Sequence, residues 1–574
     1  MSSDIIFDEI LDEIVALKDN NLKYISNEGK TTKITDINQN DKIISATRGS
    51  DVVNISFDRF KLVIDALIQN KPIHVDTVFN SSGNDRTIIE TILCHTSHIG
   101  YMKARTGRNK EKNKVIQYFK QRIHDTGEIC DVSGEEFKSD NDDFTTNEAS
   151  NLNLYKPFLL LAGISGTGKT RFIREQVKNN PDLDNYCLVP VRPDWHEPSD
   201  LLGYISRISG KKEYVSTPVL HFITQAWIHI FECVGEVRAD GKIGLSQEQL
   251  DHIPPFWLCL DEMNLAPVEQ YFADYLSVLE TRHWYTSSEL TAFNGKEGVE
   301  YDYLYQCDPL LKADTLRQQL DENARTELAE KLGLDLNIAL HQEIWASFCQ
   351  HGIAIPFNLM VAGTVNMDET THGFSRKVID RALTFDFNEF FPNDFDAYFA
   401  PALQPKRLGY PTWSDGRAIT GIPELEQLSK ESVTFLKAVN GILQQSPFEL
   451  AYRALNELML ALLAHHPANP AELVAIWDDF MMCKVLPRIE GDNDKLRSHQ
   501  TADSDLLTDL EKVLAEQFTE HWEGTRPDLF NHKVAATGEN SAPAEPPHVP
   551  CRSKKKLAWM KERLARQCFT SFWP

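Results

Sequence analysis

The sequence predicts an α/β fold of the P-loop class, and three observations lead to this prediction. A short apolar run, Phe158 to Leu161, is followed by a glycine-containing loop and then by a helical pattern that begins near Lys169. The loop reads GISGTGKT and fits the phosphate-binding pattern G-x-x-x-x-G-K-T in full. Two more apolar runs, 256–260 and 358–365, read as buried strands that end in polar residues.

The residue types of the loop explain how it would hold phosphates. Glycines let successive backbone N–H groups face an anion, Lys169 neutralises the β and γ phosphates, and the Thr170 hydroxyl can ligate Mg²⁺. ATP and GTP share these phosphates, so the loop does not distinguish between them. A chance glycine-rich turn is the alternative, and the strand before the loop and the helix after it argue against that alternative. The expected nucleotide-binding residues are Gly163, Gly166, Thr167, Gly168, Lys169 and Thr170.

Composition restricts the class of protein. A chain of 574 residues is too long for one hydrophobic core and is expected to form three or four units. The formal charge of −25 argues against a protein that coats DNA with its whole surface, so any DNA contact must be local. The ten cysteines include no Cys-x-x-Cys pair, and no apolar stretch approaches the roughly 18 residues of a membrane span. A cytoplasmic protein with reduced thiols and no membrane contact is expected.

Residues 1–128 are expected to form an N-terminal recognition or adaptor domain, with helical patterns at Ile5 to Leu17, Phe57 to Ile68 and Arg86 to Cys94. Between Lys103 and Arg122 lie eight basic residues and one acid. This cluster is either a patch that contacts DNA phosphates or the solvated face of a helix, and a run of charge alone does not decide between them. The acidic, polar segment 129–150 reads as a linker.

The carboxylates of the predicted site follow the run 256–260. Asp261 would hold Mg²⁺ through water, and Glu262 would orient and activate the water that attacks the γ phosphate. The run 358–365 ends in Asn366, which can hydrogen-bond that water or the γ phosphate. An asparagine at the end of a strand is otherwise usually a turn residue.

The rest of the chain is mainly helical. The core is expected at 151–415, with an insertion near 285–350, followed by helices at 416–530 (Glu424 to Leu443, Phe448 to His465 and Leu473 to Leu486), a Pro/Ala-rich linker at 531–550 and a basic amphipathic helix at 551–574. The terminal helix would either dock a partner protein or nucleic acid, or pack on the preceding helices. A loop around Gly210 with Arg207, Lys211 and Lys212 could project towards a substrate, although an ordinary exposed loop is the simpler reading.

The order of these motifs resembles the AAA+ ATPase superfamily. The segments LDEMNLAPVEQYFADYLSVLETR and GTVNMDETTHGFSRKVIDRA look like its McrB-type branch, the GTP-using motor subunits of modified-cytosine restriction systems and their relatives. The resemblance covers about residues 155–495. It implies a parallel sheet flanked by helices, then an all-helical lid, with a separate mixed α/β domain before them.

The resemblance also assigns roles to individual residues. Asn366 would take the sensor-one role, and Arg381 would be the arginine finger that reaches the γ phosphate of a neighbouring subunit. Arg376 and Lys377 are second choices, and a salt bridge with Asp380 is the alternative role for Arg381. Arg453, in AYRALNE, matches the second sensor arginine and is grouped with the nucleotide-binding residues. A finger supplied by a neighbour implies a ring, usually a hexamer in this superfamily.

Three functional hypotheses follow. The first is an NTPase ring motor, using ATP or GTP with Mg²⁺, that acts on DNA in a restriction or anti-phage defence system while a separate nuclease subunit cuts. The second is an ATPase that remodels protein complexes, and the third is a nucleotide-dependent binding switch. In McrB-type proteins the N-terminal region recognises modified DNA, and residues 1–128 depart from the known versions of that region.

Overall fold

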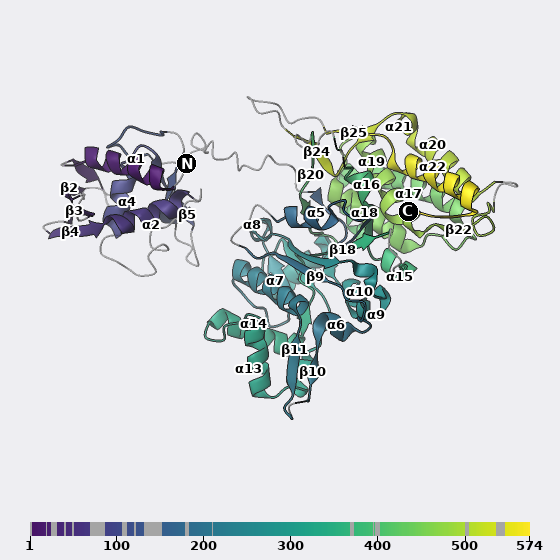
Figure 1. Ribbon diagram of the computed structural model, residues 1–574, viewed down its shortest axis with the longest axis horizontal. Helices are drawn as coiled ribbons and strands as arrows, with labels where there is room; N and C mark the ends of the chain where they lie inside the picture. Colours follow the sequence, from purple (N-terminus) through teal and green to yellow (C-terminus); the bar gives the residue numbers. More distant parts are fainter. Residues whose placement is uncertain are drawn as a thin grey trace. The chain divides into compact units, whose positions relative to one another are not determined.

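The chain forms two compact units, residues 1–148 and 149–574. Figure 1 traces their helices and strands in a computed structural model. The structure describes residues 3–18, 20–23, 31–38, 42–48, 51–68, 86–105, 112–119, 122–130, 152–177, 183–208, 210–367, 372–393, 395, 402–499, 504–534 and 546–573. Most of the expected acidic linker 129–150 therefore lies outside the described residues.

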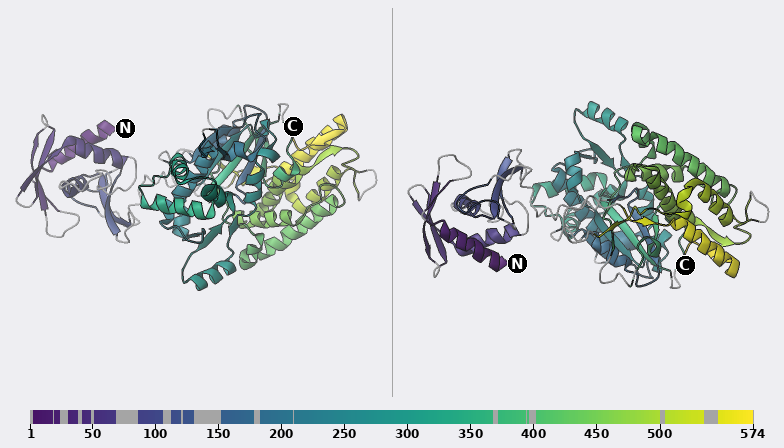
Figure 2. Two further views of the ribbon diagram at one scale, coloured as in Figure 1. Left: turned by 90° about the horizontal axis from the view of Figure 1, so that it is seen from below. Right: turned by 90° about the horizontal axis from the view of Figure 1, so that it is seen from above.

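The N-terminal unit packs helices against a sheet of four strands in the order β1-β2-β3-β4, each antiparallel to the next. Figure 2 shows the helices beside these strands. Ile10 and Ile14 of α1, and Phe60 and Ile64 of α2, are almost fully buried, as their helical spacing requires. The elements are α1 (Ser3–Ala16), β1 (Asn21–Lys23), β2 (Thr31–Asn38), β3 (Ile43–Arg48), β4 (Asp51–Ser56), α2 (Phe57–Ile68), α4 (Arg86–Cys94), β5 (Ile99–Arg105) and β6 (Lys112–Tyr118).

Four of the eight basic residues between Lys103 and Arg122 lie on β5 and β6, which pair in antiparallel register: Lys103, Arg105, Lys112 and Lys114. For these four residues the backbone is strand, so the helix-face interpretation is wrong for the part of the cluster that the two strands carry. Strand-forming residues such as Val115, Ile116 and Tyr118 explain the preference for a strand over a helix. Of the eight basic side chains only Arg122 lies among the described ones, and the expected contact with DNA stays a prediction.

The second unit is built around a five-stranded sheet in the order β19-β8-β18-β13-β9, in which every neighbouring pair is parallel. Strands β8 and β18 are buried along their whole length, as expected when both faces of a parallel sheet are covered. The register pairs Asn366 with Gly163 and Asp261 with Pro190. We call the edge where these strands end the carboxyl edge, and the opposite edge the amino edge. The strands are β8 (Phe158–Gly163), β9 (Tyr186–Pro190), β13 (Phe256–Asp261), β18 (Leu359–Asn366) and β19 (Leu383–Asp386).

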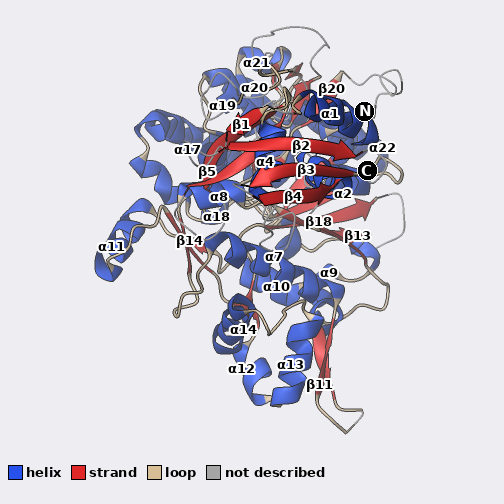
Figure 3. Ribbon diagram, turned by 90° about the vertical axis from the view of Figure 1, so that its left-hand side faces the viewer, coloured by secondary structure: helices blue, strands red, loops and turns tan. Residues whose placement is uncertain are grey.

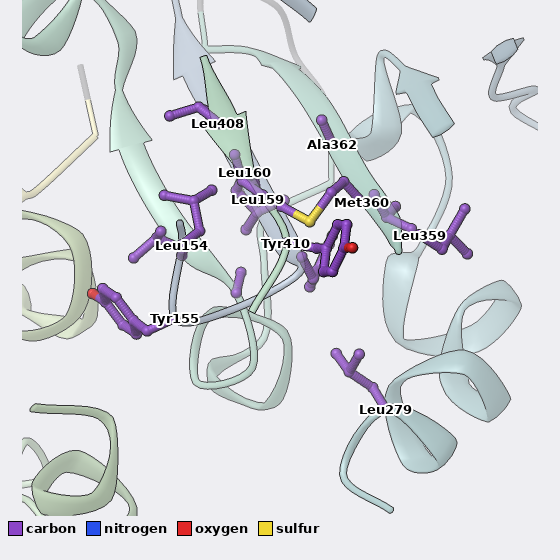
Figure 4. Close-up of a cluster of buried hydrophobic side chains, with 14 of the residues drawn as sticks. Leu154, Tyr155, Leu159, Leu160, Leu279, Leu359, Met360, Ala362, Leu408 and Tyr410 are labelled. Carbon is purple, nitrogen blue, oxygen red and sulfur yellow. The ribbon is translucent and has the colours of Figure 1, made fainter. Parts of the chain in front are cut away.

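Apolar side chains hold this sheet in place. Figure 4 shows Leu159 and Leu160 of β8 beside Met360 and Ala362 of β18, and all four are buried. Burial of a leucine or methionine side chain contributes about 1.5–3 kcal/mol. The ends of the strands are therefore fixed relative to one another, and so are the side chains that these ends carry.

Helices cover the sheet. Helix α7 (Pro218–Val234) packs on β9 and β13, and α5 (Lys169–Glu175) packs on β13 and β18. Helix α7 begins where the Thr217 hydroxyl accepts a hydrogen bond from the Leu220 N–H, and it ends at Gly235 in the left-handed conformation. Shorter helices follow the strand ends: α6 (Pro198–Leu202), α8 (Gln247–His252), α9 (Val268–Tyr271), α10 (Ala273–Leu279), α15 (Arg376–Ile379) and α16 (Phe387–Phe390).

The segments inserted around the core are partly strand. The loop around Gly210 lies at the tip of the β10–β11 hairpin, which projects at the lower end of the unit in Figure 1 and Figure 3. The expected insertion at 285–350 contains four helices and part of a three-stranded sheet, β12-β15-β14. The elements are β10 (Gly203–Ser206), β11 (Glu213–Ser216), β12 (Ile243–Leu245), β14 (His283–Trp284), α11 (Ser287–Glu297), β15 (Tyr303–Gln306), β16 (Pro309–Leu311), α12 (Ala313–Gln318), α13 (Glu322–Lys331), α14 (Ala339–His351) and β17 (Ile353–Ala354).

The C-terminal region is mainly helical, and three short strand pairs, β20–β24, β23–β25 and β22–β26, tie its ends down. Parts of the expected linker 531–550 are strands β24 and β25. Among the described helices, none has both the length and the apolar composition needed to cross a lipid bilayer. The elements are β7 (Leu152–Asn153), β20 (Leu403–Pro405), β21 (Leu408–Gly409), α17 (Pro423–Leu443), α18 (Tyr452–His465), α19 (Pro470–Phe480), β22 (Glu490–Asp492), α20 (Leu506–Phe518), α21 (Glu520–Glu523), β23 (Arg526–Pro527), β24 (Asn531–Lys533), β25 (His548–Val549), α22 (Arg552–Gln567) and β26 (Phe569–Ser571).

Helix α22 is the expected basic helix, and it packs on the other helices of the region. Arg552 is 5% exposed and forms ion pairs of 2.9 Å with Asp479 and with Asp528. Lys556 is 6% exposed and lies 2.7 Å from Asp386, at the end of β19. Four of the more exposed cations of α22 also have acidic neighbours, in the pairs Lys554–Glu523, Lys555–Glu389, Lys561–Glu511 and Arg566–Glu562. Of the two interpretations of this helix, packing on the helical region is the one observed.

Candidate active site at the carboxyl edge

The loop between β8 and α5 has the backbone that its glycines allow. Gly166 has φ 81° and Gly168 has φ 90°, in the left-handed region that other residues rarely adopt. A Cβ atom at either position would meet nothing within 4 Å, so backbone conformation and not space selects glycine here. The loop therefore presents open backbone beside the end of β8.

Lys169 curls back over this loop. Its side-chain nitrogen Nζ donates hydrogen bonds to the carbonyl oxygens of Gly163, at 3.0 Å, and Ile164, at 2.8 Å. The residue is 5% exposed. The ammonium group is thus held at the loop, next to the open backbone at Gly166 and Gly168.

Thr170 connects the loop to the end of β13. Its hydroxyl donates to Asp261 Oδ1 at 2.9 Å, although the two residues are 91 positions apart in the chain. The structure therefore brings together the two residues that the sequence predicts as Mg²⁺ ligands. Among the described residues, no group of three or more His, Cys, Asp or Glu side chains is placed to hold a metal ion. One carboxylate and one hydroxyl fit Mg²⁺, which usually takes few protein ligands and completes its shell with phosphate and water.

Glu262 and Asn366 also meet at this edge. Asn366 Nδ2 donates to Glu262 Oε1 at 3.1 Å. Glu262 has φ 52° and ψ 50°, a left-handed backbone conformation that is uncommon for a residue other than glycine. Backbone strain of this kind often occurs at functional sites and persists where neighbouring groups hold it.

Thr364 is the group that holds this backbone, and the sequence analysis missed it. The Thr364 hydroxyl donates to Asp261 Oδ1 at 2.7 Å and accepts a hydrogen bond from the Glu262 backbone N–H at 2.9 Å. A signal was available, because alternate residues of a strand share a face and Thr364 stands two positions before Asn366. One buried hydroxyl thus joins the Asp261 carboxylate to the Glu262 backbone.

Arg381, the predicted arginine finger, lies at the amino edge. Arg381 stands just before β19, whose first residue Leu383 pairs with Leu159 near the start of β8. The 6 residues of β8 separate the two edges by roughly 17 Å, at about 3.3 Å per residue. Arg381 therefore lies far from the loop 163–170 of the same chain.

Arg453 lies beside Arg381 at the amino edge, and not near the loop 163–170. Arg453 Nη2 lies 2.8 Å from Glu280 Oε2, and Arg381 Nε lies 3.3 Å from Glu280 Oε1. The sequence groups Arg453 with the nucleotide-binding residues Gly163 to Thr170, and the structure places it at the other edge of the sheet. The cause is the docking of α18, whose Glu457 pairs at 2.6 Å with Lys156, just before β8.

Asp380, the residue next to Arg381, is held in place by several cationic side chains. The Asp380 carbonyl oxygen accepts hydrogen bonds from Lys156 at 2.8 Å and from Lys484 at 2.5 Å. The Asp380 carboxylate lies 3.2 Å from Arg488 Nε, so its ion pair is with Arg488 and not with Arg381. Burial lowers the pKa of Lys156 to about 7, with Lys484 adding to the decrease and Glu457 opposing it.

Arg376, a second choice for the finger, serves a different contact. Its Nη1 donates to the Pro447 carbonyl oxygen at 2.7 Å, and its guanidinium lies 5.2 Å from the centre of the Phe448 ring. These contacts join α15 to the segment between α17 and α18. Arg376 is thus part of the joint between the sheet and the helical region.

Comparisons with known proteins find similarity in parts of the chain. Residues 412–569 match a family described as "Domain of unknown function (DUF8727)", which covers α17 to α22. Over 127 residues the chain is 32% identical to "Type II restriction enzyme NmeDI" of Neisseria meningitidis serogroup C. The match covers 21% of this chain and 36% of that protein, so the chain spans about a third of the length of this relative. A segment of this chain is therefore similar to part of a restriction enzyme.

Proposed function

We propose that this chain is a nucleoside triphosphatase that binds ATP or GTP at the carboxyl edge and hydrolyses the γ phosphate. The observation that carries the proposal is the meeting of Lys169, Thr170, Asp261, Glu262 and Asn366 at that edge, although they come from three separate parts of the chain. A glycine-rich turn that matched the pattern by chance would not be expected to lie beside two carboxylates at the end of β13 and an amide at the end of β18.

Each residue then has a role that follows from its position. The loop 163–170 and Lys169 bind the phosphates, and Thr170 with Asp261 would hold Mg²⁺. Bound Mg²⁺ neutralises phosphate charge. Glu262 accepts a proton from the attacking water, and Asn366 keeps the Glu262 carboxylate in place through its hydrogen bond.

We also propose that hydrolysis needs a ring of subunits, with a hexamer as the expected assembly. Arg381 and Arg453 lie at the amino edge, away from the phosphates of their own subunit. Arginines at this position can reach a triphosphate only when a second copy presents its carboxyl edge. Such arginines stabilise negative charge that grows in the transition state.

We further propose that the ring belongs to the AAA+ superfamily, near the McrB-type branch, and acts on DNA in a restriction or defence system with a separate nuclease subunit. The motifs LDEMN and GTVNMDE and the segment similar to a restriction enzyme support this proposal. Contact with DNA is expected through the basic cluster between Lys103 and Arg122.

The test is hydrolysis of ATP and of GTP by the full chain, with and without methylated and unmethylated DNA. We expect hydrolysis that needs Mg²⁺ and that DNA stimulates. Lys169→Ala should abolish nucleotide binding, whereas Glu262→Gln should retain binding and lose hydrolysis. Glu269→Gln, on α9 after the site, is a matched control and should hydrolyse normally.

Hydrolysis that a protein substrate stimulates and DNA does not would favour remodelling of protein complexes. If Glu262→Gln still binds its target, and nucleotide hydrolysis by the unaltered chain neither moves DNA nor remodels a protein, a binding switch would be favoured.

A further inference from the structure

We propose that Glu280 is a positioning residue, which holds Arg381 and Arg453 as a pair for the triphosphate of a second copy of this chain. The inference rests on the proposed function. It deepens that function by assigning a residue that touches no phosphate itself, and by making Arg453 the companion of Arg381.

The Glu280 carboxylate bridges Arg381 and Arg453. One carboxylate oxygen faces Arg381 Nε at 3.3 Å and the other faces Arg453 Nη2 at 2.8 Å. Two guanidinium groups this close repel each other unless an anion lies between them. The carboxylate removes that repulsion and leaves the trio with a net positive charge, which suits a phosphate partner.

The bridge leaves donors for a phosphate. A guanidinium has five N–H donors, and each arginine gives only one nitrogen to Glu280. Arg381 also donates from Nη1 to the Lys377 carbonyl oxygen at 3.3 Å. The side chains of Arg381 and Arg453 are 22% and 41% exposed, so the pair is accessible from the surface. Tyr452, beside Arg453, is 90% exposed, as expected of an aromatic residue at an interface between copies.

Both arginines come from rigid surroundings. Arg381 follows Asp380, whose carbonyl oxygen is held by two lysines. Arg453 lies one helical turn before Glu457, which pairs with the same two lysines. The backbones are therefore fixed, and the remaining freedom lies in the long arginine side chains. Glu280 removes that freedom for both at once.

The first experiment measures steady-state hydrolysis by Glu280→Ala. We expect kcat to fall about 10- to 100-fold, because a misplacement of about 1 Å can cost that much, and KM to stay within about twofold. Glu280→Gln should lie between Glu280→Ala and the unaltered chain, since its amide oxygen can still accept from one arginine. Glu431→Ala removes an exposed carboxylate of α17 and should leave kcat unchanged. Thermal unfolding and size-exclusion chromatography check that each variant folds and assembles.

The second experiment mixes Glu280→Ala with Glu262→Gln subunits. The first variant keeps an intact carboxyl edge, and the second keeps an intact arginine pair, so mixed rings should place one next to the other. We expect the hydrolysis rate per Glu280→Ala subunit to rise at least about fivefold on mixing, because the neighbour supplies the arginines. A role of Glu280 within its own subunit, structural or catalytic, predicts no such rise.

The outcomes separate this inference from the proposed function. If the unaltered chain hydrolyses neither ATP nor GTP, the proposed function fails and this inference fails with it. If Arg381→Ala loses activity while Glu280→Ala keeps or increases it, the positioning role of Glu280 alone is refuted. If mixing gives no increase although both variants assemble, the action of Glu280 on a second copy is refuted.

Discussion

The Thr364 hydroxyl donates a hydrogen bond to Asp261 Oδ1 at 2.7 Å and accepts one from the backbone N–H of Glu262. A single side chain on β18 therefore holds both the Asp261 carboxylate and the backbone of Glu262, the residue that follows β13. We expect Thr364→Val to lower kcat and to raise the Mg²⁺ concentration needed for half-maximal activity. It should also destabilise the chain by about 1–3 kcal/mol, because the Glu262 N–H loses its acceptor in a buried place. A Mg²⁺ titration and urea unfolding measure the two effects.

Thr364→Ser is the control for this prediction. Serine keeps the hydroxyl and loses one methyl group, so kcat and the Mg²⁺ requirement should remain close to those of the unaltered chain. Equal losses in Thr364→Ser and Thr364→Val would point to packing and not to the hydrogen bonds.

The hydrogen bond between Asn366 and Glu262 predicts a change in pH dependence. Asn366→Asp places a second carboxylate beside Glu262, and like charges raise the pKa of such a pair. Because Glu262 must be ionised to accept a proton, the acidic limb of the kcat profile should move to higher pH. Asn366→Ala should lower kcat about 10- to 100-fold without this displacement. Profiles of kcat against pH distinguish the two variants, and superimposable profiles would contradict the prediction.

The buried pairing of α22 predicts a large difference between two cations of the same helix. Arg552→Met removes one buried cation from Asp479, which keeps Arg526, and from Asp528, which keeps hydrogen bonds from Asn531 and the Phe530 N–H. Breaking a buried ion pair by removing one partner costs about 3–5 kcal/mol. Lys555→Met removes a cation whose side chain is 71% exposed, and it should have little effect because exposed ion pairs contribute little. Urea unfolding of the full chain measures both. Comparable stabilities of the two variants would show that the buried network contributes less than its geometry suggests.

The lowered pKa of Lys156 predicts how stability varies with pH. The folded chain releases this proton at about pH 7, whereas the unfolded chain keeps it up to about pH 10.5. Between these values the unfolded state binds more protons, so the contribution of Lys156 makes the folded chain more stable as pH rises. Lys156→Met should remove this dependence. Urea midpoints at pH 6.5 and 9 measure it, and Lys430→Met, at an exposed residue, should retain the slope of the unaltered chain.

The sequence predicts those parts of the fold that depend on local pattern. The strands ending at Gly163, Asp261 and Asn366 and most of the long helices follow from apolar spacing, and the parallel sheet with a helical C-terminal region is observed. The run of charge at 103–122 leaves its backbone conformation open, because charge does not distinguish a strand from a helix, and β5 and β6 are found there. The role of Thr364 depends on which strands neighbour each other, and a single strand does not reveal that.

The position of Arg453 shows a second kind of limit. A motif in a helix identifies a residue type at a place in the chain, but the docking of that helix decides what the residue faces. Here the contact between Glu457 and Lys156 places α18 at the amino edge, where Arg453 forms an ion pair with Glu280. These are pairings between residues more than a hundred positions apart, and nothing in the local pattern indicates them.

Strand β8 is followed by the glycine-containing loop at one end, and at the other end it follows Lys156, whose ammonium group holds the Asp380 carbonyl oxygen. Its leucines are fully buried, and a close-packed interior resists compression. A displacement of the loop when a nucleotide binds or leaves should therefore move Lys156 along with it. Under the proposed function, β8 would therefore be a rigid mechanical link, which couples nucleotide occupancy at one site to the arginines proposed to act on the next.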